Sequence, residues 1–336
     1  MVEQLISQLA HVELLTPTPQ ESLEFFTDVL GLEESGRDGQ SVYLRCWGDY
    51  FHHSVVLTEA DEPGMGHAAW RAAGPEQLER AVAQLEASGF GEGWVDGAVG
   101  HGRAYRYRGP GGHLHEIFWD VERYEAPAEK RSRFPARPQR PTAHGVAPRQ
   151  VDHVTVSTAD PLGDAKWYRD TLGYRFTEYT GLDEHPDVIV FAMVTTNEKS
   201  HDLGLGGDRS SIPGRLHHLA FWVDAVEDVL RAADVVMEAG GKIEFGPGKH
   251  GMGEQTYLYF REPGGLRVEI NSGGYRLYQP DWEPVKWLPS EGSNTMYTNV
   301  GYPPSMLEAF PPAAEAAMPE PELAALANPW ATQEQH

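Results

Sequence analysis

Cysteine and positive charge are both scarce in this chain. The single cysteine, Cys46, excludes an intrachain disulfide and any zinc or iron–sulfur site built from cysteine ligands. Lys and Arg number 27 against 50 Asp and Glu, which gives a formal net charge of −23. Because so negative a surface repels phosphate backbones and anionic lipids, we expect neither a nucleic acid nor a membrane as a partner.

Long hydrophobic runs are absent as well. No apolar stretch approaches the ~18 residues that a membrane-spanning helix needs. Residues 1–7 have no basic start and no long apolar core, so we expect no secretory signal and a cytoplasmic protein. The 336 residues, 40% of them hydrophobic, are enough for two globular domains, and the 15 histidines are the first indication of chemistry.

An internal repeat divides the chain into two copies of one unit. Three pairs of segments match, two at a spacing of 142 positions and one at 153: 25–32 with 167–174, 11–16 with 153–158, and 107–112 with 260–265. We therefore predict two domains, a linker rich in Pro and Arg between them, and a C-terminal extension. Their respective ranges are 6–123 and 150–290, 124–149, and 291–336.

Hydrophobic periodicity predicts the elements of the second copy. Helices are expected over 161–171 and 226–239, because glycine follows each at the usual stop position. Alternating segments predict strands over 151–157, 188–194, 216–223, 256–260 and 266–270. The predicted fold class is α+β, with four βαβββ modules that form two barrel-like domains with mixed sheets.

Strand alternation brings two histidines and a glutamate to the polar faces of their strands. His153, His218 and Glu269 each lie opposite an apolar set, whereas His217 is expected to point with the apolar residues. Two neutral imidazoles and one carboxylate can occupy one face of an octahedral ion and leave three positions open. This ligand set is typical of non-haem Fe(II), and Mn(II) is tolerated by the same ligands.

One motif in the second copy is long and specific. Along the chain it consists of Gly248-Lys249-His250, seven residues, Leu258-Tyr259, two residues, Glu262-Pro263-Gly264-Gly265, three residues and Glu269. It resembles the signature of the type I extradiol ring-cleavage dioxygenases, a branch of the vicinal oxygen chelate superfamily. Segments 60–65 and 215–218 are similar to those of catechol 2,3-dioxygenases.

This resemblance implies a vicinal oxygen chelate, or glyoxalase-like, fold over both copies. It also implies extradiol cleavage of a catechol by O2 at a non-haem Fe(II), with a 2-hydroxymuconic semialdehyde-type product, in the degradation of aromatic compounds. Since such proteins are usually active only in the second copy, the domain over 150–290 is expected to be the catalytic one. A homo-oligomer, preferably a tetramer, is implied in the same way.

The resemblance also implies roles for single residues. The His, His and Glu triad described above becomes the set of iron ligands, and His201 becomes the acid–base catalyst. His250 and Tyr259 correspond to residues that hydrogen-bond the bound catecholate and oxygen intermediates, and Phe191 to an apolar residue of the substrate pocket. Arg267, on the same face as Glu269, is expected to support the site from outside.

The first copy contains a similar triad, His11, His67 and Glu116. Arg106, however, aligns with Tyr259, and an arginine beside a metal site repels a cation. We therefore interpret this first triad as vestigial.

Three other functions share the predicted fold and stay open. A glyoxalase-type isomerase needs a fourth ligand, usually a second glutamate, where this chain has Ser200-His201-Asp202. A 4-hydroxyphenylpyruvate dioxygenase has the same triad but lacks the pattern of His250 and Tyr259. A drug-binding protein of the bleomycin-resistance type has no metal triad and is not an enzyme.

Overall fold

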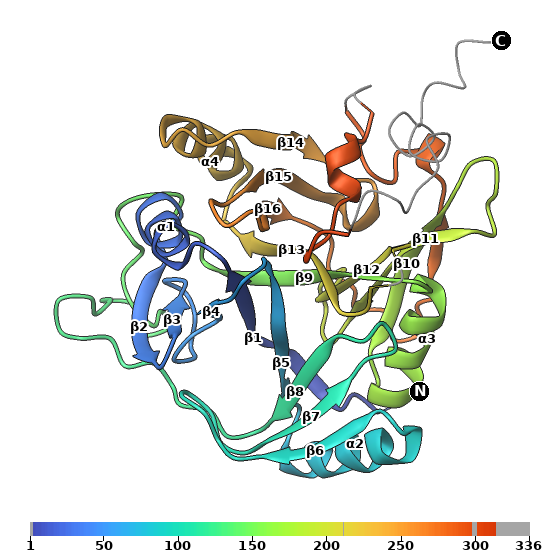
Figure 1. Ribbon diagram of the computed structural model, residues 1–336, viewed down its shortest axis with the longest axis horizontal. Helices are drawn as coiled ribbons and strands as arrows, with labels where there is room; N and C mark the ends of the chain where they lie inside the picture. Colours follow the sequence, from blue (N-terminus) through green and yellow to red (C-terminus); the bar gives the residue numbers. More distant parts are fainter. Residues whose placement is uncertain (1–2, 211, 298–300, 314–336) are drawn as a thin grey trace.

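Two mixed β-sheets, one for each copy, make up the protein (Figure 1). The computed structural model describes residues 3–210, 212–297 and 301–313. The strands of the eight-stranded first sheet have the order β2-β3-β4-β1-β5-β8-β7-β6. The elements of this copy are β1 (Ile6–Thr16), α1 (Pro19–Glu24), η1 (Phe25–Val29), β2 (Glu33–Asp38), β3 (Ser41–Arg45), β4 (Val55–Glu59), β5 (Gly64–Ala72), α2 (Pro75–Ser88), β6 (Gly91–Val95), β7 (Ala104–Arg108) and β8 (Leu114–Phe118).

The second sheet repeats this arrangement with one additional strand at its edge. Its nine strands have the order β14-β15-β16-β13-β9-β12-β11-β10-β17. The elements of this copy are β9 (Gln150–Thr158), α3 (Pro161–Leu172), β10 (Arg175–Gly181), β11 (Ile189–Thr195), β12 (Leu203–Gly207), β13 (Arg215–Trp222), α4 (Val226–Glu238), β14 (Ile243–Lys249), η2 (Met252–Glu254), β15 (Gln255–Arg261), β16 (Arg267–Gly273), β17 (Val285–Trp287), η3 (Pro289–Glu291) and η4 (Pro304–Leu307).

Each sheet is built from two βαβββ units. The central strand β1 runs parallel to β4 and antiparallel to β5. In the second copy, β9 pairs in the same way with β12 and β13. The predicted fold class, an α+β tandem duplication with mixed sheets, is therefore confirmed.

Local sequence explains where the elements begin and end. Helix α3 begins after Asp160, whose carboxylate accepts a hydrogen bond from the backbone of Gly163, and ends at Gly173 in the left-handed conformation. Strand β12 was not among the predicted strands because its sequence, Leu-Gly-Leu-Gly-Gly, is typical of a turn. It fits between β9 and β11 because a Cβ on Gly204 would lie only 2.3 Å from the hydroxyl oxygen of Thr155.

An ion pair and a backbone bridge hold the segments outside the sheets against them. Residues 124–149 contain no helix or strand, and Lys130 of this segment pairs with Glu33 of β2 at 2.9 Å. Near the C-terminus, Phe310 forms a bridge to Leu216, which places η4 over the second sheet. Residues 298–300 and 314–336 of the predicted extension lie outside the described residues. No helix in the described part of the chain is long and apolar enough to cross a membrane.

Candidate metal centre

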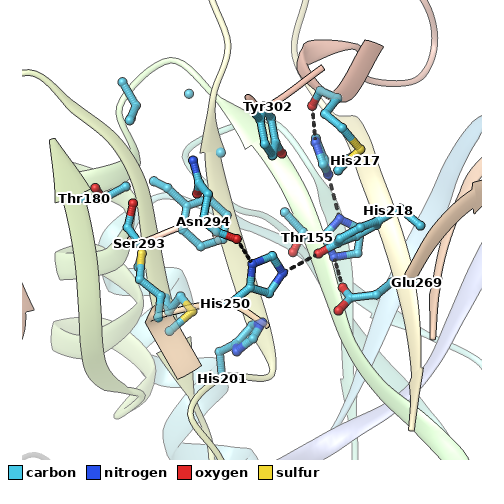
Figure 2. A pocket seen from close by; sticks show the side chains of 18 of the residues that line it. Thr155, Thr180, His201, His217, His218, His250, Glu269, Ser293, Asn294 and Tyr302 are labelled. Carbon is cyan, nitrogen blue, oxygen red and sulfur yellow. Dashed lines mark hydrogen bonds and ion pairs between the residues drawn. The ribbon is translucent and has the colours of Figure 1, made fainter. Parts of the chain in front are cut away.

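A cavity of about 140 Å³ opens on the face of the second sheet (Figure 2). Phe191, predicted as a pocket residue, lines it, and so do Tyr302 and Met306 from the C-terminal extension. The polar groups of the lining are imidazoles, hydroxyls, amides and the carboxylate of Glu269. In the part of the chain that the structure describes, the lining includes neither Lys nor Arg.

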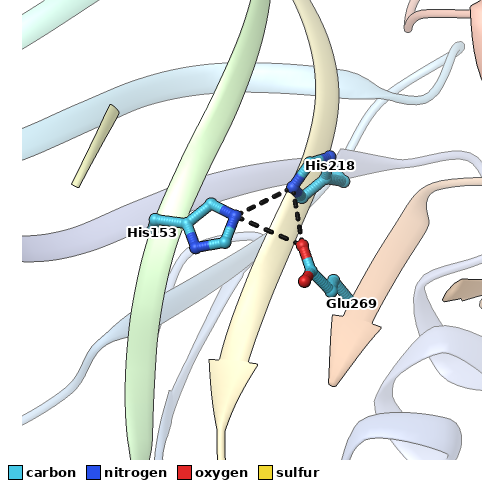
Figure 3. A group of neighbouring side chains, drawn as sticks. All are labelled: His153, His218 and Glu269. Carbon is cyan, nitrogen blue, oxygen red and sulfur yellow. Dashed lines mark hydrogen bonds and ion pairs between the residues drawn. The ribbon is translucent and has the colours of Figure 1, made fainter. Parts of the chain in front are cut away.

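The two histidines and the glutamate predicted as metal ligands lie on three neighbouring strands at this cavity (Figure 3). His153 is on β9, His218 on β13 and Glu269 on β16. The register places both His153 and Glu269 opposite Ala220 of β13, and His218 precedes Ala220 by two residues. Because alternate residues of a strand share a face, the three side chains point to the same side of the sheet.

Three ligand atoms converge with nearly equal spacing. His153 Nε2 lies 3.0 Å from His218 Nε2 and 3.2 Å from Glu269 Oε2, and His218 Nε2 lies 3.0 Å from the same oxygen. Among the described residues, this is the group whose ligand atoms all lie within 4.8 Å of one another. Ligands bound at about 2.1 Å and at right angles are about 3.0 Å apart, so the spacing fits one face of an octahedral ion.

Hydrogen bonds on the far side of each imidazole place the proton of the neutral ring on Nδ1, so that Nε2 carries the lone pair. His153 Nδ1 donates to Asp152 Oδ2 at 2.8 Å. His217 Nε2 donates to the carbonyl of Met306 at 2.7 Å, so His217 Nδ1 is an acceptor (Figure 2). His218 Nδ1, at 2.6 Å, therefore donates to it. The backbone carbonyl of Met306 thus determines the tautomer of His218 through His217.

The donor set fits a divalent metal ion. Apart from the two imidazole Nε2 atoms near its Oε2, the carboxylate of Glu269 has no hydrogen-bond partner among the described residues, although the residue is only 1% exposed. Buried lone pairs that face one another require a cation between them. A proton competes for this place: burial lowers the pKa of His153, but Glu269 and Asp152 raise it to about 9. Burial lowers the pKa of His218 to about 4, so this ligand is a neutral imidazole.

A buried network holds the carboxylate that orients His153. Asp152 Oδ2 accepts hydrogen bonds from Gln255 Nε2 at 2.8 Å and from Asn271 Nδ2 at 3.0 Å. Lys199 Nζ lies 3.4 Å from Asp152 Oδ1. Burial raises the pKa of Asp152, but Lys199 and His153 hold it well below its usual range. The carboxylate is therefore ionised and fixed, as a partner of a metal-bound histidine should be.

The structure places His201 beside the three ligands. Its ring centroid is 4.0 Å from that of His153, and its Nδ1 lies 3.1 Å from the hydroxyl of Ser200. Burial lowers the pKa of His201 well below its usual value, and the neighbouring His153 lowers it further. His201 is therefore neutral at pH 7 and can accept a proton before it donates one.

His250, labelled in Figure 2, and Tyr259 both line the cavity beside the three ligands. His250 Nδ1 donates to the carbonyl of Asn294 at 2.5 Å, so its Nε2 accepts the hydroxyl of Tyr259 at 3.0 Å. Tyr259 is opposite Glu269 in the register of β15 and β16. Burial raises the pKa of Tyr259 well above 10, so this residue stays a hydrogen-bond donor.

The structure corrects the position expected for His217. The register of β13 and β9 shifts between Leu216 and His218, which makes His217 an additional residue that breaks the alternation. Its ring therefore lines the cavity and does not join the apolar core. The sequence signal was the adjacent pair of histidines, but periodicity alone selects only one of the two.

Arg267 is a buried anchor for the C-terminal segment. It pairs with Glu244 at 2.9 Å and donates to the carbonyls of His217, Ser305 and Glu308. Arg267 therefore supports the site indirectly, by holding the backbone of His217 and of the segment around η4.

The first copy has a looser version of the triad. His11 Nε2 lies 3.0 Å from His67 Nε2, but Glu116 Oε2 lies 4.0 Å from His67 Nε2. Arg106 occupies the register position of Tyr259 and binds Glu116 Oε1 through Nε at 2.7 Å and Nη2 at 2.6 Å.

Comparison with known proteins defines the class to which this fold and this site belong. The sequence model of the Glyoxalase/Bleomycin resistance protein/Dioxygenase superfamily matches residues 8–117 and 150–270, and the chain belongs to this superfamily. Its relatives there are extradiol dioxygenases, and the resemblance seen in the sequence motif is thereby confirmed.

Two relatives from Geobacillus align over most of the chain. The metapyrocatechase of Geobacillus stearothermophilus is 38% identical over 303 residues, 89% of this chain and 92% of that protein. The manganese-dependent 2,3-dihydroxybiphenyl 1,2-dioxygenase of Geobacillus genomosp. 3 is 40% identical over 290 residues, 85% of this chain and 91% of that protein. Among solved structures, the 2,3-dioxygenase LapB of Pseudomonas sp. KL28 has a TM-score of 0.77 and is 28% identical, covering 86% of this chain and 99% of its own.

Proposed function

We propose that the protein is an extradiol dioxygenase that cleaves a catechol with O2 at an Fe(II) or Mn(II) ion held by His153, His218 and Glu269. The observation that carries this proposal is the convergence of their three lone pairs at one end of a cavity. Because these ligands occupy only one face of an ion, positions remain for the two oxygens of a catechol and for O2.

The surrounding residues supply the proton transfers and hydrogen bonds. An Fe(II) or Mn(II) ion held by His153, His218 and Glu269 would supply open positions for catechol and O2 and a path for electron density between them. Neutral His201 accepts a proton from a catechol hydroxyl and returns it to oxygen as the ring opens. The Tyr259 hydroxyl donates to His250 in the structure and has to turn from His250 to donate to a substrate oxygen. Both atoms of O2 enter the product, so no further reductant is needed.

The lining of the cavity favours a catechol without a charged substituent. Among the described residues that line it, Glu269 is the one carboxylate, and none is Lys or Arg. A substrate carboxylate would therefore lose its hydration without gaining a cationic partner. We expect kcat/KM for methylcatechols to exceed that for homoprotocatechuate by about 100-fold or more. Equal values for the two substrates would contradict this assignment.

The decisive experiment is turnover by the purified chain loaded with ferrous iron under nitrogen. After air is admitted, catechol should consume one O2 per molecule and give a yellow ring-opened product. The Glu269→Gln variant, loaded in the same way, is the matched control and should do neither. Tight binding of catechol without O2 uptake would instead indicate a sequestering protein, and isomerisation of a thiol adduct would indicate a glyoxalase-type enzyme.

The location and assembly of the protein belong to the same proposal. A cytoplasmic homotetramer is supported by the resemblance to the extradiol dioxygenases. Light scattering coupled to gel filtration tests the assembly, and a monomer of 37.3 kDa would contradict it.

A further inference from the structure

The first copy contains a cluster of histidines where the second copy has its metal-binding triad. His11 on β1 and Glu116 on β8 both lie opposite Ala69 of β5, and His67 precedes Ala69 by two residues. His101 adds a further imidazole, with Nε2 4.0 Å from Glu116 Oε2. The backbone therefore presents the same three ligand positions as in the second copy, and one more.

Two of these imidazoles are held with a bare Nε2. His67 Nδ1 donates to Glu13 Oε2 at 2.9 Å, and His101 Nδ1 donates to the carbonyl of Gly102 at 2.7 Å. Since both partners are acceptors, each Nε2 keeps its lone pair. That of His67 accepts a hydrogen bond from His11 Nε2 at 3.0 Å, which an ion would replace, and that of His101 lies 4.0 Å from Glu116 Oε2.

A carboxylate orients His67, whereas a histidine orients His218 in the second copy. Gly66 stands at the position of His217, and a Cβ on it would lie 2.0 Å from Glu13 Oε2. Glu13, at the position of Thr155, uses this space to reach His67. A carboxylate behind a histidine is the usual partner of a metal-bound imidazole.

A fourth imidazole of the cluster is buried without a partner. His53 lies two residues before β4, as His201 lies two residues before β12, and its ring centroid is 4.6 Å from that of His11. Its Nε2 is buried and has no hydrogen-bond partner among the described residues. Such an atom indicates a ligand or a water that completes the cluster.

The positive charge of Arg106 does not oppose a cation here. Its guanidinium binds Glu116 Oε1 and leaves Oε2 directed at the imidazoles. Glu13 and Glu116 together carry two negative charges against one from Arg106. The local balance is therefore favourable for a divalent ion.

We propose that His11, His67, His101 and Glu116 form a second metal site, which binds a divalent ion of the Zn²⁺ class and takes no part in ring cleavage. Three imidazoles and a carboxylate are a tetrahedral set typical of zinc. A hollow of about 10 Å³ adjoins His11 and His101 without reaching His67 or Glu116. It is large enough for a water beside the cluster but not for a catechol. Tetrahedral ligands lie about 3.4 Å apart. Because His11 and Glu116, and likewise His67 and His101, present ligand atoms more than 4.8 Å apart, these side chains have to close by more than about 1.4 Å when the ion binds.

The test uses the full-length chain with its catalytic triad disabled by His218→Gln and Glu269→Gln. After removal of metals with a chelator, Zn²⁺ binding is measured by competition with a chromophoric chelator. We expect one Zn²⁺ per chain with Kd below about 1 μM. A third substitution, His67→Gln, should weaken binding at least about 100-fold. His185→Gln, at an exposed histidine, is the matched control and should bind as tightly as the parent.

A pair of glycine variants tests the orienting carboxylate without removing a ligand. In the same background, Gly66→Ala should displace Glu13 and weaken Zn²⁺ binding by about 10–100-fold. Gly64→Ala, on the same strand, meets its nearest atom at an ordinary 3.6 Å and should have no effect. Circular dichroism of the metal-free variants separates lost binding from lost folding.

Three results would overturn the proposal. The first is that the parent variant binds no Zn²⁺ at 10 μM. The second is that the His67→Gln variant binds Zn²⁺ as tightly as the His185→Gln variant. The third is that the Gly66→Ala variant folds and binds Zn²⁺ as tightly as the Gly64→Ala variant. Because the parent variant has no catalytic triad, none of these results depends on whether the proposed dioxygenase activity is correct.

Discussion

The two copies place the same three ligand types on corresponding strands, but the residues around these ligands differ. In the second copy, His217 orients His218 and Tyr259 stands opposite Glu269. In the first copy, a glycine and a glutamate replace the orienting histidine, and Arg106 binds the carboxylate. The ligands alone therefore do not determine the chemistry, which depends on what orients them and on how much space remains beside them.

The two copies differ most clearly in the volume of the cavity beside their histidines. The second site opens into a cavity of about 140 Å³, whereas the hollow beside the first has about 10 Å³. The larger cavity is covered by η4, which Arg267 ties down through backbone carbonyls. The cavity beside His153, His218 and Glu269 is therefore large enough for a substrate, whereas the hollow beside His11 is not.

The largest effect is expected at the carboxylate ligand. Glu269→Gln should abolish tight iron binding and lower turnover by about 10³-fold or more, because an amide is a much weaker ligand than a carboxylate. Iron content and O2 uptake measure the two effects. The comparison between copies breaks down if Glu116→Gln lowers turnover to the same extent. Glu76→Gln, at an exposed residue of α2, controls for the loss of a negative charge.

The second largest effect is expected at His201, the proposed proton carrier. His201→Asn should keep iron content and catechol affinity but lower kcat by about 10²–10⁴-fold, because asparagine cannot transfer a proton. Stopped-flow turnover under saturating O2 measures the loss. An undiminished kcat would remove His201 from this role, and an equal loss in His53→Asn would mean that the first copy also takes part.

A smaller effect should come from the residue that orients His218. His217→Leu removes the acceptor for His218 Nδ1 and should weaken Fe(II) binding by about 10–100-fold. His217→Gln can still accept from His218 and donate to Met306, so it should restore most of the affinity. Titration with Fe(II) under nitrogen compares the two variants. If glutamine is no better than leucine, His217 acts by packing and not by fixing the tautomer.

The sequence was sufficient for the elements that depend on local patterns. The ends of α3 and α4 follow from Gly173 and Gly240, and strand alternation brought the triad together. His217 escaped this reasoning because a register shift interrupts the alternation. Its contact with Met306 spans 89 residues, and no local pattern contains a contact of that kind.

The first copy was harder to interpret for a similar reason. Arg106 looked incompatible with a cation because the sequence shows its charge but not its partner. That Glu116 binds this charge, and that Gly66 admits Glu13, are both properties of packing. His53 corresponds to His201 only once β4 is aligned with β12, and this alignment requires the strand register, which the structure gives.

The smallest predicted effect concerns buried carboxylates in corresponding loops. Asp49, before β4, has no lysine beside it, and burial raises its pKa from 3.8 to about 6. Asp202, before β12, is 2.8 Å from Lys199, and its pKa is lowered although burial opposes this. Folded protein thus holds a proton on Asp49 that the unfolded chain releases above pH 4. This stabilisation is lost as pH rises through 6, whereas that from Asp202 is lost only as pH falls below its unfolded value.

Asp49→Asn should therefore flatten the pH dependence of stability by about 1.4 kcal/mol between pH 5 and pH 7. Urea unfolding of the variant and the wild type across this range measures the difference. Asn can keep the acceptor for the backbone N–H of Cys46 and for the hydroxyl of Ser54, which makes it the conservative replacement. Parallel curves for the two proteins would mean that Asp49 is already ionised at pH 5, and that the missing lysine does not distinguish the two loops.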